Sequence, residues 1–221
     1  MDKMNLEQFK LIFWDFDGVI KDSVEVKTFA FMELFEAYGK DVEMKIYNHN
    51  QTNGGMTRFE KIPLYLKWSN QTINDYKVKN LCEKFSSLVE EKVINSEWVS
   101  GVESYLRNNE YSQTFIVISS TPQNELERIL SALDLNDCFT LILGSPKSKI
   151  EWLNKTINKL KVDKKDCLMI GDMKVDYEAA LINDISFLLR KHPLNKIAFS
   201  EYKGDSFEDF LNCNGRKYYG K

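Results

Sequence analysis

Acidic residues occur in pairs at two places in the sequence, each directly after a short apolar run. Asp15 and Asp17 stand two residues apart in WDFDG, and Asp172 and Asp176 stand four apart in GDMKVD. Like charges this close repel one another unless a cation lies between them or they share a proton. Each pair alone also suits a polar strand end or a helix N-terminus, whose dipole favours acids. Two pairs together favour a site where a divalent cation such as Mg²⁺ bridges the protein to an anionic ligand.

Side chains that suit a phosphate group follow two further apolar runs. Ser119 and Ser120 end the run FIVISS, and Pro122 then opens a predicted helix, whose free N–H groups can bind an anion. Lys149, or alternatively Lys147, follows the next run in GSPKSK. Either lysine alone would be interpreted as a solvated surface residue. Together with the four acids, these residues supply the donors and positive charge that a phosphate group needs.

Five short apolar runs bounded by turn residues predict strands that are buried on both faces of a sheet. They alternate with amphipathic stretches, which is the βαβ pattern of a parallel sheet. The predicted strands are 10–16, 114–119, 140–144, 167–171 and 186–190, and the predicted helices between them are 101–108, 122–133, 148–160 and 175–181. The predicted fold class is therefore α/β, with a doubly wound parallel sheet that binds ligands at the carboxyl ends of its strands.

About 95 residues separate the first predicted strand from the second, which is too long for a simple crossover. Helical patterns fill most of this stretch, from a start at Asp22-Ser23 to a stop at Gly39, and again over 57–68 and 75–93, with a polar loop at 48–55. We therefore expect a core domain of residues 1–19 and 96–221 and a helical insertion of residues 20–95.

Three aromatic residues and two histidines are expected to have structural roles. The stripe Trp68, Tyr76 and Phe85 favours a hydrophobic core of the helical insertion rather than a platform for stacking bases. His49 is expected in an exposed loop, and His192, before a proline, in a turn.

The composition limits the classes of partner. Thirty Lys+Arg against 33 Asp+Glu give a formal net charge of −3, which leaves no excess positive charge for nucleic acid or an anionic membrane. No apolar run approaches the roughly 20 residues that span a bilayer, and the first residues lack the apolar stretch of a signal peptide. The scattered cysteines are expected to be reduced thiols; they are Cys82, Cys138, Cys167 and Cys213. The sequence thus predicts a soluble, cytoplasmic protein and leaves its oligomeric state open.

The ordered set of motifs resembles the haloacid dehalogenase superfamily, in particular its phosphatases with a helical cap, such as phosphoglycolate phosphatase and relatives of β-phosphoglucomutase. The resemblance runs from about Phe9 to Arg190 and rests on DxDG after the first strand, Ser after the second, Lys before a helix and then GDxxxD. It implies a Rossmann-like core and identifies the helical insertion as a cap domain.

The resemblance also implies roles for the residues of these motifs. Asp15 would be the nucleophile that forms an aspartyl-phosphate, and Asp17 would be the general acid and base. The implied phosphate-binding residues are Ser119, Ser120 and Lys149, and the implied Mg²⁺ ligands are Asp15, Asp17 through its backbone carbonyl, Asp172 and Asp176. The dehalogenase branch lacks an acid at the position of Asp17, so its presence favours phosphoryl transfer.

The predicted function is therefore Mg²⁺-dependent hydrolysis of a small phosphorylated metabolite, by resemblance a sugar phosphate or a phosphoglycolate-like acid. In capped relatives a glycine-bearing loop closes over the site, and NGGMTRF places Arg58 where it would bind the leaving group, unless it simply starts a helix. A phosphomutase and a non-catalytic binding relative are the alternatives. Phosphonate hydrolysis would need a cap lysine that forms a Schiff base; the available lysines, none in a distinctive setting, are Lys45, Lys61 and Lys67.

Overall fold

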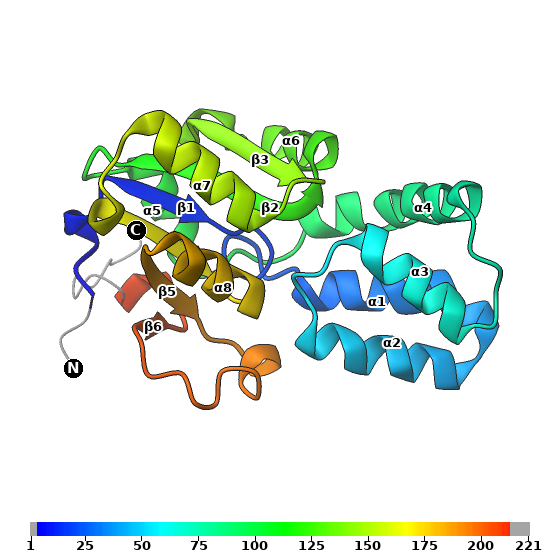
Figure 1. The fold of residues 1–221 in the computed structure, drawn as a ribbon. Coiled ribbons are helices and arrows are strands. Elements are labelled where there is room, and N and C mark those ends of the chain that lie inside the picture. The colour runs from blue at the N-terminus through cyan, green and yellow to red at the C-terminus, as the bar shows by residue number, and fades with distance from the viewer. Residues whose placement is uncertain (1–3, 213–221) are drawn as a thin grey trace.

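A six-stranded parallel sheet forms the centre of the computed structural model, which describes residues 4–212. The strands are β1 (Leu11–Trp14), β2 (Thr114–Pro122), β3 (Leu141–Ser145), β4 (Cys167–Gly171), β5 (Ser186–Arg190) and β6 (Ser206–Phe207), in the order β3-β2-β1-β4-β5-β6. The chain moves outward from β1 to β3 and then returns to place β4 on the other side of β1 (Figure 1). The doubly wound α/β fold predicted from the sequence is confirmed, and its crevice lies beyond the carboxyl ends of β1 and β4.

Helices cover both faces of the sheet and also extend beyond it. The helical insertion contributes α1 (Val24–Phe35), α2 (Lys40–Thr52), α3 (Arg58–Trp68) and α4 (Asp75–Ile94), and the rest of the chain α5 (Val102–Asn108), α6 (Gln123–Ala132), α7 (Lys149–Leu160) and α8 (Lys174–Asn183). Short 3₁₀ segments lie at Leu6–Gln8, Glu36–Tyr38, Asn136–Cys138, Lys164–Asp166, Pro193–Asn195 and Phe210–Asn212. None of the helices in residues 4–212 is long and apolar enough to cross a bilayer.

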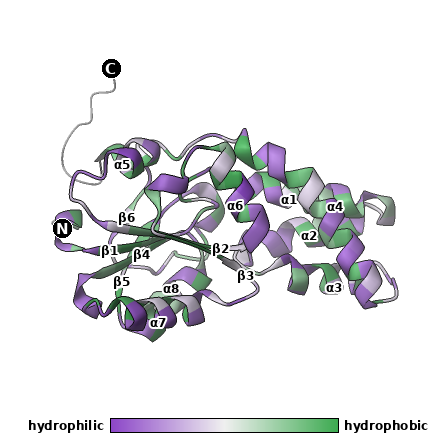
Figure 2. Cartoon of the chain, turned by 90° about the horizontal axis from the view of Figure 1, so that it is seen from above, coloured by the Kyte–Doolittle hydropathy of each residue, from purple (hydrophilic) through white to green (hydrophobic). Residues whose placement is uncertain are grey.

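The strands are apolar on both faces because each face is covered by helices. In β1, Leu11 and Phe13 pack with residues of α7 and α8, whereas Ile12 and Trp14 pack in a second cluster with residues of α5 and α6. Figure 2 shows the sheet edge-on between these two helix layers, with hydrophobic colour concentrated along the strands. This burial fixes the sheet and, with it, the positions where its strands end.

The helical insertion lies beyond the carboxyl ends of the strands (Figure 1). Its centre is aromatic: Phe31 of α1 stacks on Phe85 of α4 with ring centroids 3.9 Å apart and meets Tyr65 of α3 edge-on at 5.4 Å. These rings belong to the same hydrophobic cluster as Ile12 and Trp14 of the sheet. The insertion therefore packs directly over the edge of the sheet at which the motif residues emerge.

Four local expectations are wrong. His49, expected in an exposed loop, lies within α2 and is half-buried. The polar loop predicted at 48–55 is helical as far as Thr52, because the Asn50 side chain is buried and donates to the Ile46 carbonyl, 2.8 Å away. Tyr76 is 81% exposed and so is not part of the insertion's core, unlike buried Phe85. Pro122 ends β2 and precedes the helix rather than occupying its first turn.

The described cysteines agree with the sequence expectation. Cys82, Cys138 and Cys167 are free thiols, and burial raises the pKa of each, that of Cys167 to about 11. Cys213 lies outside the described residues.

Candidate active site

Three buried carboxylates meet in the crevice between β1 and β4. Asp15 directly follows β1, Asp172 directly follows β4, and Asp176 lies in the first turn of α8; one oxygen from each lies within 4.8 Å of the others. Gly18 permits this approach, because it has φ +80° and a Cβ there would lie 2.3 Å from Asp172 Oδ2. The two acidic motifs, about 155 residues apart in the sequence, are therefore brought together as predicted.

Lys149 supplies the positive charge at these acids. Its Nζ donates to Asp15 Oδ1 at 2.7 Å and to Asp176 Oδ1 at 2.5 Å. Burial lowers the pKa of Lys149, but the two carboxylates outweigh burial and leave the pKa raised, so the lysine is an ammonium. Lys147, the alternative, lies elsewhere, with its Nζ 4.2 Å from the centre of the Trp152 ring. Lys149 is the first residue of α7, after the cap residue Ser148, and this position directs its side chain to the acids.

The acid cluster fits a hard divalent cation. Asp172 Oδ1 is buried without a hydrogen-bond partner among the described residues. Burial and the neighbouring Asp176 raise the pKa of both Asp15 and Asp172 well above the usual range, against the opposing effect of Lys149. Carboxylate oxygens are the ligands that Mg²⁺ prefers, and a bound cation would stabilise all three charges.

His192 orients one of these carboxylates, and sequence reasoning missed it. Its Nε2 lies 2.9 Å from Asp172 Oδ2, and Asn195 Nδ2 donates to the Asp172 backbone carbonyl at 2.8 Å. Burial lowers the pKa of His192 to about 4, which favours the neutral ring. A hydrogen bond to an ionised Asp172 then requires the proton on Nε2, because a carboxylate only accepts. The available signal was its place just after β5, at the same edge of the sheet as the acids. Hydrogen bonds of this kind hold a metal-binding carboxylate in one orientation.

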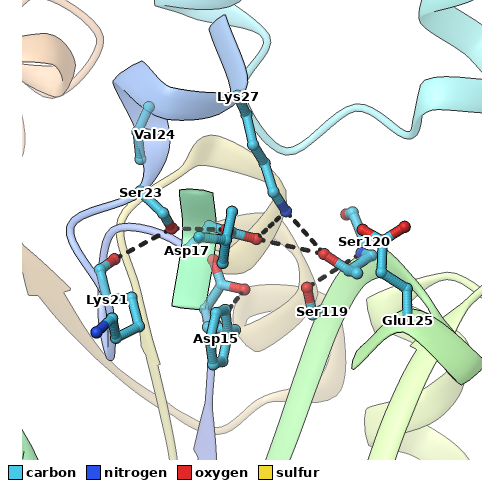
Figure 3. Close-up of polar contacts among 12 residues, drawn as sticks. Asp15, Asp17, Lys21, Ser23, Val24, Lys27, Ser119, Ser120 and Glu125 are labelled. Atoms are coloured by element: carbon cyan, nitrogen blue, oxygen red, sulfur yellow. Dashed lines mark hydrogen bonds and ion pairs between the residues drawn. The ribbon is translucent and has the colours of Figure 1, made fainter. Parts of the chain in front are cut away.

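Asp17 lies next to Asp15 and is held by groups from α1 and β2. Lys27 Nζ donates to Asp17 Oδ2 at 2.5 Å and to Thr121 Oγ1 at 2.8 Å, and Ser23 Oγ donates to Asp17 Oδ1 at 2.7 Å. Figure 3 shows Lys27 and Ser23 reaching Asp17 from the start of the helical insertion. Burial raises the pKa of Asp17, but Lys27 and Ser23 outweigh burial and lower it, so Asp17 is a carboxylate.

Ser23 and Lys27 contact Asp17, which the sequence did not indicate for either residue. Ser23 precedes α1 as expected, but its side chain makes no capping hydrogen bond and instead serves Asp17. Lys27 was not singled out, because a lysine on a helix one turn after its start is indistinguishable in sequence from a solvated one.

The two serines at the end of β2 line the same cavity. Buried Ser119 accepts at Oγ from the Thr121 N–H at 3.1 Å, and Ser120 Oγ donates to the Gly55 carbonyl at 2.7 Å. Gly55 is packed against the core: a Cβ there would lie 2.2 Å from Val175 Cγ2. The glycine-bearing loop of the insertion therefore touches the crevice residues directly.

Arg58 lines the cavity, but its guanidinium is already engaged. Its two terminal nitrogens donate to Glu125 Oε1 at 2.6 Å and Oε2 at 2.7 Å, and one also donates to Ser86 Oγ at 2.6 Å. This pair joins α3 of the insertion to α6 beside the sheet. The contact of Arg58 with a leaving group, expected from the sequence, would compete with Glu125.

The cavity enclosed by these groups is small, with a volume of about 60 Å³. Asp15, Asp17 and Lys149 lie on the sheet side and Lys27, Arg58 and Lys61 on the insertion side. Of the three lysines considered for a Schiff base, Lys61 is buried here, whereas Lys45 and Lys67 are exposed. The arrangement places two carboxylates, ammonium groups and hydroxyl groups around one small cavity that is partly open to solvent.

The fold and this acid cluster define an α/β protein whose three buried carboxylates fit a metal ion. The carboxylates lie between β1 and β4, where the order of the strands reverses direction. A sequence model described as haloacid dehalogenase-like hydrolase matches residues 12–190. The chain belongs to this family, which confirms the resemblance stated above and the prediction of an enzyme. Among curated proteins, none matches the sequence.

Solved structures show the same fold at low sequence identity. A β-phosphoglucomutase from Clostridium difficile superimposes with a TM-score of 0.75 at 18% identity, covering 95% of this chain and 94% of that one. A predicted phosphoglycolate phosphatase from Haemophilus somnus 129pt gives 0.68 at 17% identity, covering 92% of this chain and 95% of that one. A subfamily IA hydrolase from Geobacter sulfurreducens PCA gives 0.62 at 17% identity, covering 94% and 95%.

Proposed function

We propose that the protein is a Mg²⁺-dependent phosphatase that hydrolyses a small phosphorylated metabolite through an aspartyl-phosphate on Asp15. The observation that carries the proposal is the position of Asp15, which accepts from the Lys149 ammonium, lies within 4.8 Å of Asp172 and Asp176, and lines the same cavity as Asp17. The family match and the phosphatase and phosphomutase folds among the solved structures support it.

In the first half of the proposed reaction, an oxygen of Asp15 bonds to phosphorus and the ester P–O bond breaks. Asp17 donates a proton to the departing alkoxide. Lys149 and the Ser119 hydroxyl hold phosphoryl oxygens, and their fixed positions stabilise the charge that develops there. Asp15, Asp172 and Asp176 would hold Mg²⁺, which when bound neutralises phosphoryl charge.

In the second half, Asp17 takes a proton from a water molecule as its oxygen attacks phosphorus, which releases phosphate and restores Asp15. The lowered pKa of Asp17 keeps the carboxyl deprotonated, as a group that takes a proton must be. The acid role in the first half requires that pKa to rise, which the negative charge of an arriving phosphate ester favours.

The helical insertion is the cap domain in this proposal. Residues 20–95 would close over the crevice and exclude water, and residues 1–19 and 96–221 would form the core. The Ser120–Gly55 hydrogen bond and the Arg58–Glu125 pair support the position of the insertion over the crevice, because each joins the insertion to the core. A cytoplasmic location remains the sequence-based prediction.

Phosphate release from a panel of phosphorylated metabolites tests the proposal, with Mg²⁺ and with EDTA. We expect EDTA-sensitive release that the Asp15→Asn variant loses, whereas Asp134→Asn, which removes a fully exposed acid, leaves it unchanged. Unchanged release by Asp15→Asn contradicts the proposal. Conversion of a sugar phosphate into an isomer without release of phosphate would instead establish the phosphomutase alternative.

A further inference from the structure

Another cavity, which shares no residue with the one around Asp15, opens at the carboxyl end of β5. It has a volume of about 710 Å³ and is bounded by the end of β5 and the segment that follows this strand. Figure 1 shows this segment at the edge of the sheet, between β5 and β6. The cavity is lined by three cations, Arg190, Lys191 and Lys196, and by one carboxylate, that of Glu208. The excess of positive charge favours an anionic ligand.

Arg190 is the buried cation of this cavity, and its donors are poorly matched. The residue is 8% exposed. Its two terminal nitrogens donate to the half-exposed Asp22 carboxylate at 3.3 and 3.4 Å, whereas a well-formed charged pair has a distance of about 2.7–2.9 Å. Its Nε is buried without a hydrogen-bond partner among residues 4–212. Because a guanidinium has five N–H donors, Arg190 retains the capacity to bind an oxyanion.

Buried Arg58 provides a comparison within the same chain. Its terminal nitrogens donate to Glu125 at 2.6 and 2.7 Å, and one also donates to Ser86, so its charge is closely paired. The lysines of the β5 cavity, Lys191 and Lys196, are exposed and make no ion pair within the part of the chain that the structure describes. The buried and the exposed cations of this cavity therefore both leave positive charge for a ligand.

The same cavity adjoins the residues that support the acid cluster. His192 and Asn195 line it. They contact the side chain and the backbone carbonyl of Asp172 at 2.9 and 2.8 Å, and Asn195 also donates to the Arg190 carbonyl at 2.8 Å. A ligand bound by Arg190 would therefore lie against the residues that orient a carboxylate of the candidate active site.

We propose that this cavity is a second anion site, which binds a phosphate group through Arg190, Lys191 and Lys196. A guanidinium matches two phosphate oxygens at once, and the two ammonium groups supply the further charge that suits a phosphate dianion. Pro193 and Phe199 add an apolar part to the lining, which suits the organic part of a phosphorylated molecule. The site goes beyond the proposed reaction, because its residues contact neither Asp15 nor the cavity around it.

Calorimetric titrations with inorganic phosphate and with phenylphosphonate, both in EDTA, test the site. Without a cation, the acids of the candidate active site repel an anion, so binding there is suppressed. We expect one phosphate per chain, bound about 10- to 100-fold more weakly by Arg190→Met, the range for one hydrogen bond to a charged group. Tighter binding of phenylphosphonate would identify an organic phosphate as the ligand, and equal binding free phosphate. Failure of both probes to bind would overturn the proposal.

Exposed residues provide variants that leave the buried arginine in place. The double variant Lys191→Gln, Lys196→Gln should weaken phosphate binding about three- to tenfold, and Glu208→Gln should strengthen it. The control Lys164→Gln removes an exposed lysine just before β4, at the opposite edge of the sheet, and should bind phosphate like the unchanged protein. Circular dichroism checks that each variant is folded. Phosphate binding that is unchanged in the double variant, or in folded Arg190→Met, would overturn the proposal.

Discussion

Replacing Arg58 by methionine should strongly destabilise the protein. The Arg58 and Glu125 side chains are 4% and 2% exposed, and they share two direct hydrogen bonds of 2.6 and 2.7 Å. The variant leaves the Glu125 carboxylate buried with the Ser86 hydroxyl, 2.7 Å away, as its remaining side-chain donor.

The size of the effect follows from the loss of one partner of a buried pair, which costs about 3–5 kcal/mol. For a chain of 221 residues, each kcal/mol lowers Tm by about 2–4 °C, so Arg58→Met should lower Tm by roughly 6–20 °C. The double variant Arg58→Met, Glu125→Met removes both charges and should recover most of the loss, because no buried charge is left unpaired.

Urea and thermal unfolding followed by circular dichroism measure these differences. A matched control lies on α6, the helix that carries Glu125. Arg128 of this helix pairs with Glu90 at 2.6 Å, but the two side chains are 55% and 27% exposed. Arg128→Met should therefore cost at most about 1 kcal/mol. Equal losses for Arg58→Met and Arg128→Met would refute the reasoning, as would a double variant no more stable than Arg58→Met.

Three further predictions follow from individual contacts. The folded chain binds fewer protons than the unfolded chain between pH 7 and 10.5, because burial lowers the pKa of Lys61 from 10.5 to about 7. The free energy of unfolding should therefore rise over this range by up to about 1.4 kcal/mol per pH unit relative to that of Lys61→Met. A difference in the free energy of unfolding between the two proteins that stays constant with pH in urea titrations would contradict this. His192→Asn should weaken Mg²⁺ binding about 10- to 100-fold by calorimetry, whereas His49→Asn should not; equal effects would show that His192 does not act on the metal site. Gly55→Ala introduces a Cβ 2.2 Å from Val175 Cγ2 and should lower kcat/KM at least about tenfold, and Val175→Ala should restore it if steric contact is the cause.

The sheet side of the site was predictable from the sequence because strand ends carry positional information. A buried strand must end where its apolar run ends, and parallel strands end at one edge, so Asp15, Ser119 and Asp172 had to converge. The sequence left Lys147 as an alternative to Lys149, and the prediction chose Lys149 for its place immediately before a predicted helix. In the structure Lys149 is the first residue of α7, and its Nζ contacts Asp15 and Asp176.

The insertion side was not predictable, because a helix face has no comparable marker. Lys61 and Lys67 lie on one helix, six residues apart, yet one is buried and the other exposed. The difference arises from what packs over each residue, which local spacing does not encode. Lys27 was missed for the same reason, because it lies on a helix face and nothing in its local sequence marks the contact with Asp17. His192 did follow a strand end, but the sequence did not show that its ring meets Asp172.

Lys27 makes the charge of Asp17, the proposed acid and base, depend on the position of a helix. The ammonium that keeps Asp17 ionised is carried on α1, the first helix of the insertion, whereas Asp17 itself belongs to the turn after β1. The charge state of Asp17 therefore depends on how α1 packs against the sheet, because the contact that offsets the burial of this carboxylate is made across that packing.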